Sequence, residues 1–227
     1  MDARSAASRA RYARRGLATE GDLDPVTQSM LLRQLYMAFF EQKNFRRALQ
    51  IAEQTLALDT LLDVCHQDAA RALVMLGDID TAADHLRLAT RIAPARRRSF
   101  HLWTLGSVLY LAGRFEDAYS ALQRAVRWST TDRPLIHGHV ALVQIALERP
   151  VEELDGVIAR LEDAPCGQGY GRFVLGMLCA HAGRLRDAER YLAAFIERTR
   201  SGRVAVAVAL SGELALADQR LAGLSIH

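Results

Sequence analysis

A pattern that recurs about every 35 residues constrains this chain more than any other feature of its sequence. The clearest copy lies in residues 99–132, where two amphipathic runs flank Gly113. Each run has apolar residues three and four apart, which places them on one stripe of an α-helix. Gly113 suits a tight turn, because glycine adopts positive φ without a steric penalty. Neither helix can bury its stripe alone, so the pattern predicts helical hairpins that are stable only as a stack.

The turn position recurs through the chain at steps of 34 to 36 residues. In every copy the second residue after it is aromatic or aliphatic, and the fifth is alanine or leucine. Five copies in phase predict an array, in which the copy at residues 135–168 departs furthest from the pattern. The five turn positions are Lys43, Gly77, Gly113, Arg149 and Gly183.

The best copy resembles a tetratricopeptide repeat. The resemblance is carried by Leu102-x2-Leu105-Gly106, by Gly113, and by Ala118-x3-Leu122-x2-Ala125. It implies an all-α fold, a right-handed superhelical solenoid of antiparallel helix pairs with extra helices at both ends. We expect a basic N-terminal arm or helix at 1–25, five hairpins at 26–202 and a C-terminal capping helix at 203–227. A fold of this kind identifies neither a partner nor a reaction.

Two breaks delimit the array. Asp24 can accept hydrogen bonds from the first amides of a helix, and Pro25 suits the first helical position. After Gly202, the apolar residues from Val206 to Leu221 predict one further helix with a continuous stripe, which would cover the last repeat.

Composition bounds the class of protein. The chain has 227 residues, half of them hydrophobic, which is enough for a substantial core. It has no apolar run long enough to span a bilayer and no basic-then-apolar signal sequence, so we expect a soluble cytoplasmic protein. Three cysteines at unrelated repeat positions fit a reducing compartment. The single lysine, Lys43, beside 28 arginines points to a bacterial genome rich in GC.

All of the excess positive charge lies in the first 20 residues, whose net charge of +3 equals that of the whole chain. This arm could contact nucleic acid, an acidic protein or an anionic membrane, or it could be a solvated helix that caps the first repeat. The run from Arg96 to Arg98 is expected on a solvated loop, with an anion contact as the alternative. The arginines of the arm are Arg4, Arg9, Arg11, Arg14 and Arg15.

No motif in the sequence indicates catalysis, a cofactor or a metal. His137 and His139 are two residues apart and would point to different sides of a helix. The glycine-rich segment at 166–171 follows a predicted helix and lacks the Lys-Ser/Thr of a phosphate-binding loop, which favours a turn between repeats. We therefore expect a binding protein without catalytic residues, cofactor or metal.

In the family that the chain resembles, the first helices of successive repeats line a concave groove. The residues that bind a carboxylate tail in some members are absent, since Asn44 is the only asparagine and lies in a turn. An apolar groove suits an amphipathic helix or an extended hydrophobic segment, although the same aromatic residues could instead fill the core of a tight superhelix. The candidate groove residues are Phe100, Trp103, Ser107, Tyr110, His139, Val143, Tyr170, Phe173 and Met177.

These observations favour a protein–protein interaction scaffold or adaptor that holds a segment of a partner protein in its groove. One alternative is a chaperone-like protein that shields a hydrophobic segment of a secreted protein. The other is a nucleic-acid-associated regulator that uses the basic arm. The sequence does not define the partner or the oligomeric state.

Overall fold

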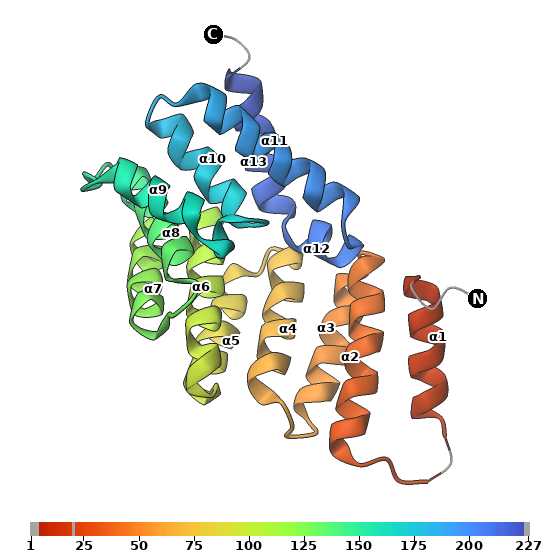
Figure 1. Cartoon of the computed structure of the whole chain (residues 1–227). Coiled ribbons are helices and arrows are strands. Elements are labelled where there is room, and N and C mark those ends of the chain that lie inside the picture. Colours follow the sequence, from red (N-terminus) through yellow and green to blue (C-terminus); the bar gives the residue numbers. More distant parts are fainter. Residues whose placement is uncertain (1–4, 20, 225–227) are drawn as a thin grey trace. The chain divides into compact units, whose positions relative to one another are not determined.

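The computed structural model describes residues 5–19 and 21–224, which form thirteen α-helices, one short 3₁₀ helix and no strand (Figure 1). The prediction of an all-α chain of paired helices is confirmed. The chain divides into two compact units, the first ending at His101 and the second beginning at Leu102. The boundary between the two units falls within one helix.

The first unit consists of a leading helix, two helical hairpins and the start of the next helix. Its helices are α1 (Ala6–Leu17), α2 (Pro25–Glu41), α3 (Phe45–Leu56), α4 (Leu62–Leu76), α5 (Ile79–Ile92) and the first two turns of α6 (Ala95–Leu111).

The second unit contains the rest of α6 and the remaining helices. These are α7 (Phe115–Trp128), α8 (Arg133–Ala146), α9 (Leu154–Asp163), the 3₁₀ helix η1 (Pro165–Gly167), α10 (Gly171–His181), α11 (Leu185–Ser201), α12 (Val204–Ala209) and α13 (Ser211–Leu224).

The hairpin turns have the backbone conformation that their sequences predict at four of the five positions. Lys43, Gly77, Gly113 and Gly183 have φ values of 58°, 85°, 73° and 74°. In the fourth copy the left-handed residue is Glu148, with φ 55°, and not the predicted Arg149. The physical reason is Pro150, which disfavours a helical conformation at the residue before it and leads into a longer connection.

Two small residues let paired helices approach closely. A Cβ atom on Gly106 would lie 2.5 Å from a side-chain atom of Leu122, and one on Gly176 would lie 2.5 Å from Leu192. The helix start at Asp24 is also as predicted, because its carboxylate accepts the amides of Val26 at 3.1 Å and Thr27 at 3.0 Å.

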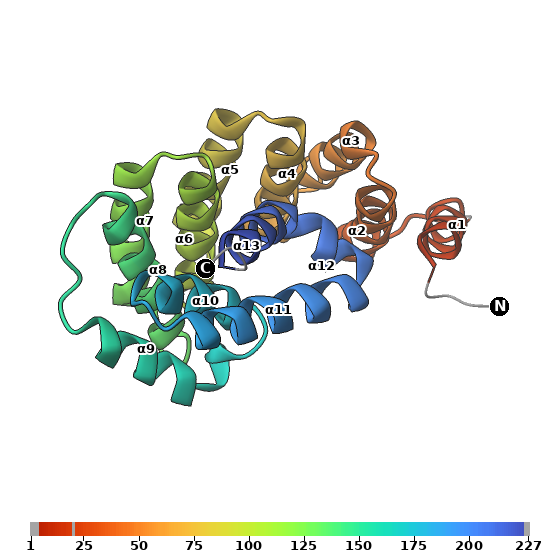
Figure 2. The same cartoon turned by 90° about the horizontal axis from the view of Figure 1, so that it is seen from above.

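The C-terminal segment differs from its prediction. The apolar stripe predicts one continuous helix, but the structure has two, α12 and α13, with a break at Leu210. The break lets Gly212 lie against Leu111, whose side chain is 3.1 Å from the position that a Cβ atom of Gly212 would take. A side chain at position 212 would therefore require Leu111 to shift, and the chain changes direction between α12 and α13 (Figure 2).

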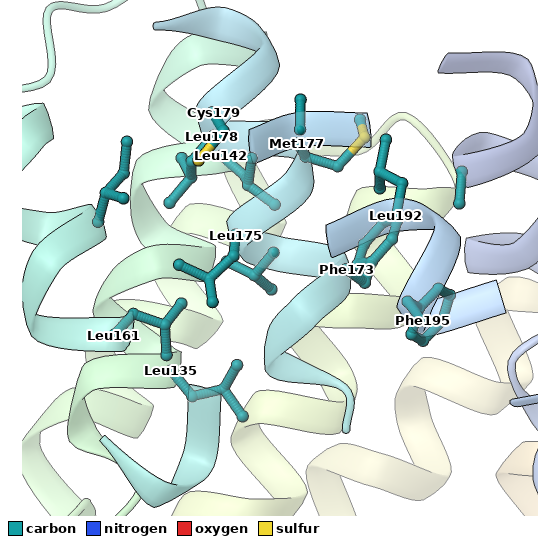
Figure 3. Packing of buried hydrophobic residues seen from close by; sticks show 14 of the residues in the cluster. Leu135, Leu142, Leu161, Phe173, Leu175, Met177, Leu178, Cys179, Leu192 and Phe195 are labelled. Carbon is teal, nitrogen blue, oxygen red and sulfur yellow. The ribbon is translucent and has the colours of Figure 1, made fainter. Parts of the chain in front are cut away.

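The core of the second unit is built from the apolar stripes of α8, α9, α10 and α11 (Figure 3). Phe173, Leu178 and Leu192 are fully buried, and Phe195 is 1% exposed. Leu214 and Ala217 of α13 belong to the same cluster. The last helix thus packs against the core of this unit.

Candidate protein-interaction site

Eight of the nine predicted groove residues lie in the second unit, and Phe100 lies in the first. They come from α6, from α8, and from α10 together with the residue that precedes it. We call these eight residues the aromatic face: Trp103, Ser107, Tyr110, His139, Val143, Tyr170, Phe173 and Met177.

The residues of the aromatic face differ in how much of their surface is accessible. His139, Val143 and Phe173 are fully buried, and Ser107 and Met177 are below one tenth exposed. The rings of Trp103, Tyr110 and Tyr170 are only partly buried. Those three rings therefore keep more accessible surface than the other five members of the aromatic face.

The rings pack mainly edge to face. The centroids of Trp103 and Tyr170 are 4.9 Å apart with an interplanar angle of 85°, and those of Tyr170 and Phe173 are 5.7 Å apart. Tyr110 meets His139 at 5.5 Å and 77°. Such pairs are favourable because the positive edge of one ring faces the negative face of the next. The cluster therefore joins α6, α8 and the start of α10 into one surface.

A buried histidine lies at the centre of this cluster. Trp103 donates a hydrogen bond from Nε1 to Nδ1 of His139 at 3.2 Å, which places the proton of the neutral imidazole on Nε2. That Nε2 atom is buried and has no hydrogen-bond partner among the described residues. Burial lowers the pKa of His139 to about 4, so the ring is neutral at physiological pH.

The polar end of the aromatic face is covered by α13. Tyr170 donates its hydroxyl hydrogen to Oε1 of Glu213 at 3.2 Å. Glu213 is 4% exposed, and its Oε2 atom has no partner among residues 5–19 and 21–224. Burial raises the pKa of Glu213 to about 7. Glu213 was not among the predicted site residues.

The first helices of the first unit carry a different kind of surface. Arg33 Nε lies 2.7 Å from the Asp68 carboxylate. Asp68 and the second aspartate of this surface, Asp63, are both buried. Asp63 accepts two hydrogen bonds of 2.7 Å from Arg97 and contacts Nε2 of His101 at 3.0 Å. We call this surface the ion-pair face; its members are Arg33, Asp63, Asp68, Arg97 and His101.

The charges of the ion-pair face shift each other's protonation. Burial alone would raise the pKa of Asp63, but the hydrogen bonds from Arg97 and His101 outweigh it and lower that pKa. Burial lowers the pKa of His101 despite its contact with Asp63. The carboxylate is therefore ionised and the imidazole is neutral at physiological pH.

The basic arm forms α1, which packs on α2 through Ala10 and Ala13. Arg9 pairs with Glu41 at 2.8 Å, and the Arg14 guanidinium lies 5.7 Å from the centre of the Phe39 ring. Arg11 and Arg15 are exposed, and Arg4 lies outside the described residues. Part of the charge of the arm is thus used to hold α1 in place.

The arginine run is not on a loop, as predicted, but in the first turn of α6. Arg97 binds Asp63, and Arg98 donates to the Ala93 carbonyl at 3.1 Å. Arg96 alone is exposed. The buried Asp63 explains the difference, because it draws the run into a structural ion pair.

Within residues 5–19 and 21–224, no three His, Cys, Asp or Glu side chains are grouped so that they could hold a metal ion. None of the described helices is both long and apolar enough to cross a membrane. The glycine-rich segment is a tight turn, because a Cβ atom on Gly167 or Gly171 would lie within 2.2 Å of a backbone oxygen.

Comparison with known proteins was made by sequence and by structure. No protein-family model matches the sequence, and neither does any curated protein. Several solved structures match the fold. A chain of the Cut9–Hcn1 hetero-tetramer of the APC/C has a TM-score of 0.63 at 13% identity, with 95% of this chain and 46% of that chain covered. PilF of Pseudomonas aeruginosa has a TM-score of 0.57 at 15% identity, with 89% and 90% covered.

These neighbours and the repeated helix pairs decide the architecture. The protein has the tetratricopeptide-repeat fold. A third neighbour is PlcR of Bacillus thuringiensis, in a structure with the peptide PapR7 and DNA, with a TM-score of 0.55 at 15% identity and coverage of 80% and 68%. At these identities the likeness concerns the fold alone.

Proposed function

We propose that this tetratricopeptide-repeat protein is a non-catalytic scaffold that binds an apolar or amphipathic segment of a partner protein at the aromatic face. One observation carries the proposal: an amphipathic helix of the same chain, α13, already lies against this unit and meets the aromatic face at Tyr170. The chemistry of the face is therefore suited to a helix of that kind.

The properties of α13 define what such a segment needs. Leu214 and Ala217 are buried in the core cluster, whereas Ala215 and Gln219 on the other side of the helix are exposed. The partly buried rings of Trp103 and Tyr170 combine a large apolar area with a polar tip. Residues of this type are enriched in protein–protein interfaces.

The fold comparison supports the class of function. Tetratricopeptide-repeat neighbours include proteins that were solved with a peptide or with protein partners, such as PlcR with PapR7 and Cut9 with Hcn1. A scaffold that binds a protein segment is in keeping with these neighbours. The aromatic face adds the expectation that the bound segment is amphipathic.

The experiment uses the two tryptophans of the chain as a matched pair. Trp103 belongs to the aromatic face, whereas Trp128 at the end of α7 is 45% exposed and is not a member of it. Tagged full-length protein, Trp103→Ala and Trp128→Ala are used to capture proteins from an extract of the source cells, with quantification by mass spectrometry.

We expect a defined set of proteins to be retained by the wild type and by Trp128→Ala, and to fall at least fivefold with Trp103→Ala. Circular dichroism checks that both variants keep their helix content. Equal retention by all three proteins would contradict binding at the aromatic face.

A further inference from the structure

We propose that α13 is an intramolecular ligand of the aromatic face, and that a partner binds by replacing it with an amphipathic helix that presents a carboxyl group to Tyr170. This inference rests on the proposed function and adds to it the chemistry of the partner and the means of regulation.

Apolar contacts along one side and one buried hydrogen bond hold α13. Leu214 and Ala217 are buried, and Leu216, Leu221 and Leu224 pack partly buried against the same cluster. Glu213 accepts the hydrogen bond of Tyr170. Arg200 also pairs with Asp218 at 2.6 Å, but both side chains are about half exposed. An ion pair of that kind contributes little in water. The docking of α13 therefore depends on one apolar edge and one carboxyl group.

The docked helix leaves a buried polar atom of its own unsatisfied. Oε2 of Glu213 has no hydrogen-bond partner within the described part of the chain. A buried donor or acceptor without a partner opposes the docked state, because the same group is hydrated when the helix is released. A cap evolved only for stability would have an apolar residue at position 213. The buried carboxyl group instead makes α13 a ligand of limited affinity.

The chain before α13 is built so that the helix can separate. The preceding helix α12 has only six residues, and Val204 and Val206 on it are exposed. The break at Leu210 is followed by Ser211 and Gly212. A short helix is marginally stable by itself. Release of α13 thus requires a change at this junction and no unfolding of the hairpins.

The occupant of the face indicates the chemistry of its competitor. A replacing helix would carry a carboxylic acid near its start and apolar residues one, four and eight positions later, as Glu213, Leu214, Ala217 and Leu221 do in α13. The acid suits this position because Tyr170 offers a hydroxyl donor there. A lysine at that position would bring a buried cation without a carboxylate to pair with.

The test uses a fluorescein-labelled peptide with the sequence of residues 209–224 as the probe. Its binding to three full-length proteins is measured by fluorescence anisotropy. In the first protein α13 is unchanged. In the second, Leu214→Asp and Ala217→Asp remove the buried edge of α13. In the third, Ala215→Asp adds the same charge on its exposed side and serves as the control.

We expect the double variant to bind the peptide at least tenfold more tightly than the wild type and the Ala215→Asp control. A peptide with Glu213→Lys should bind the double variant at least tenfold more weakly than the unchanged peptide. Failure of the helical, folded double variant to bind the peptide would overturn the proposal, as would equal binding of both peptides.

A second variant guards against loss of folding in the double variant. Gly212→Ile places a branched side chain against Leu111 and should push the first turn of α13 away while leaving the aromatic face intact. It should also bind the peptide more tightly than the wild type does; if it is helical and binds no better, the proposal fails.

The outcomes of this test and of the capture experiment are independent. Capture that depends on Trp103, without exchange of the peptide, would leave the proposed function standing and remove the intramolecular ligand. Exchange of the peptide, without capture that depends on Trp103, would establish the intramolecular ligand and overturn the proposed function.

Discussion

The two units place opposite chemistry at the same position of their repeats. In each repeat, one residue of the first helix lies ten positions before the turn position. This residue is Arg33 or Gln67 in the first unit, and Trp103, His139 or Phe173 in the second. In the first unit, arginines of this surface pair with nearly buried carboxylates. In the second unit, the rings pack on one another and α13 covers their polar end.

The difference shows how one scaffold supports two kinds of surface. A buried ion pair satisfies itself once its geometry is fixed, and breaking it leaves an uncompensated charge. An aromatic surface exposes apolar area until something covers it, which invites a ligand. We therefore place structural rigidity in the ion-pair face and exchangeable binding in the aromatic face.

The largest expected effect concerns the core below the aromatic face. Phe173→Ala should reduce the free energy of unfolding of the second unit by about 3–5 kcal/mol, because it removes a fully buried ring and leaves a cavity. Both tryptophans lie in this unit, so their fluorescence during urea titration reports on it alone. Phe100→Ala is the control, since Phe100 is 43% exposed and its loss should leave that transition in place.

Breaking the ion-pair face comes next. Asp63→Asn should destabilise the first unit by about 2–3 kcal/mol, because it leaves Arg97 and the buried His101 without their carboxylate. This free-energy loss is smaller than for a fully buried ion pair, because Arg97 is partly exposed. Circular dichroism should show earlier loss of helix, while the tryptophan transition of the second unit stays unchanged. A shift of the tryptophan transition alone would contradict this division.

The same residue predicts an acid dependence in the first unit. Because the pKa of Asp63 is lower in the folded state, its contribution is present above the pKa of the unfolded state and is lost as pH falls through the folded pKa. Wild-type protein should lose this contribution in acid, and Asp63→Asn should show a smaller loss. An identical acid dependence in both proteins would remove the role of Asp63.

Glu213 and His139 give the second unit a different pH dependence. The raised pKa of Glu213, about 7 against the usual 4.5, makes its contribution fall as pH rises between those values. The lowered pKa of His139, about 4 against 6.5, makes stability rise with pH over nearly the same range. The two effects oppose each other, and Tyr170 stays neutral throughout because burial raises its pKa.

Glu213→Gln should reveal the contribution of His139. The variant should be more stable than the wild type at pH 8, on the order of 1–3 kcal/mol, because it no longer buries a carboxylate. Its stability, measured by tryptophan fluorescence, should rise from pH 4 to pH 6.5, whereas that of the wild type changes less. Parallel pH profiles of the two proteins would show that the Glu213 carboxyl group does not titrate in this range.

The smallest expected effect concerns the basic arm. Arg15 is exposed, so Arg15→Ala should change the free energy of unfolding by less than about 0.5 kcal/mol. Arg9→Ala should cost more than this, since Arg9 pairs with Glu41. Thermal unfolding followed by circular dichroism separates the two, and a larger loss with Arg15→Ala would assign that residue a structural contact.

Much of the fold could be predicted because it depends on short-range periodicity. The regular spacing of the turn positions predicted the paired helices, and the glycines at positions 77, 113 and 183 have positive φ as expected. The errors arose where a distant contact decides local structure. Gly212, next to the break before α13, lies against Leu111, and Arg97 binds Asp63 from a helix that the sequence alone suggested was a loop.

The candidate site was harder to predict for the same reason. The first-helix spacing placed the aromatic residues on one side of their helices but left open whether they line a groove or fill a core, and Phe173 and His139 are fully buried. Glu213 escaped notice because the contact with Tyr170 joins residues 43 positions apart. No local pattern indicates such a contact. The prediction that these residues contact a partner stands as the proposal argued above.

Hydrogen exchange of the unmodified full-length protein, resolved by mass spectrometry, tests the central claim most directly. If α13 is an exchangeable ligand, its amides at 211–224 should exchange at least tenfold faster than those of α10 and α11, whose protection should persist after α13 has exchanged. Exchange of α13 in step with α10 and α11 would show that it leaves the aromatic face only when the whole unit unfolds, and would contradict the account.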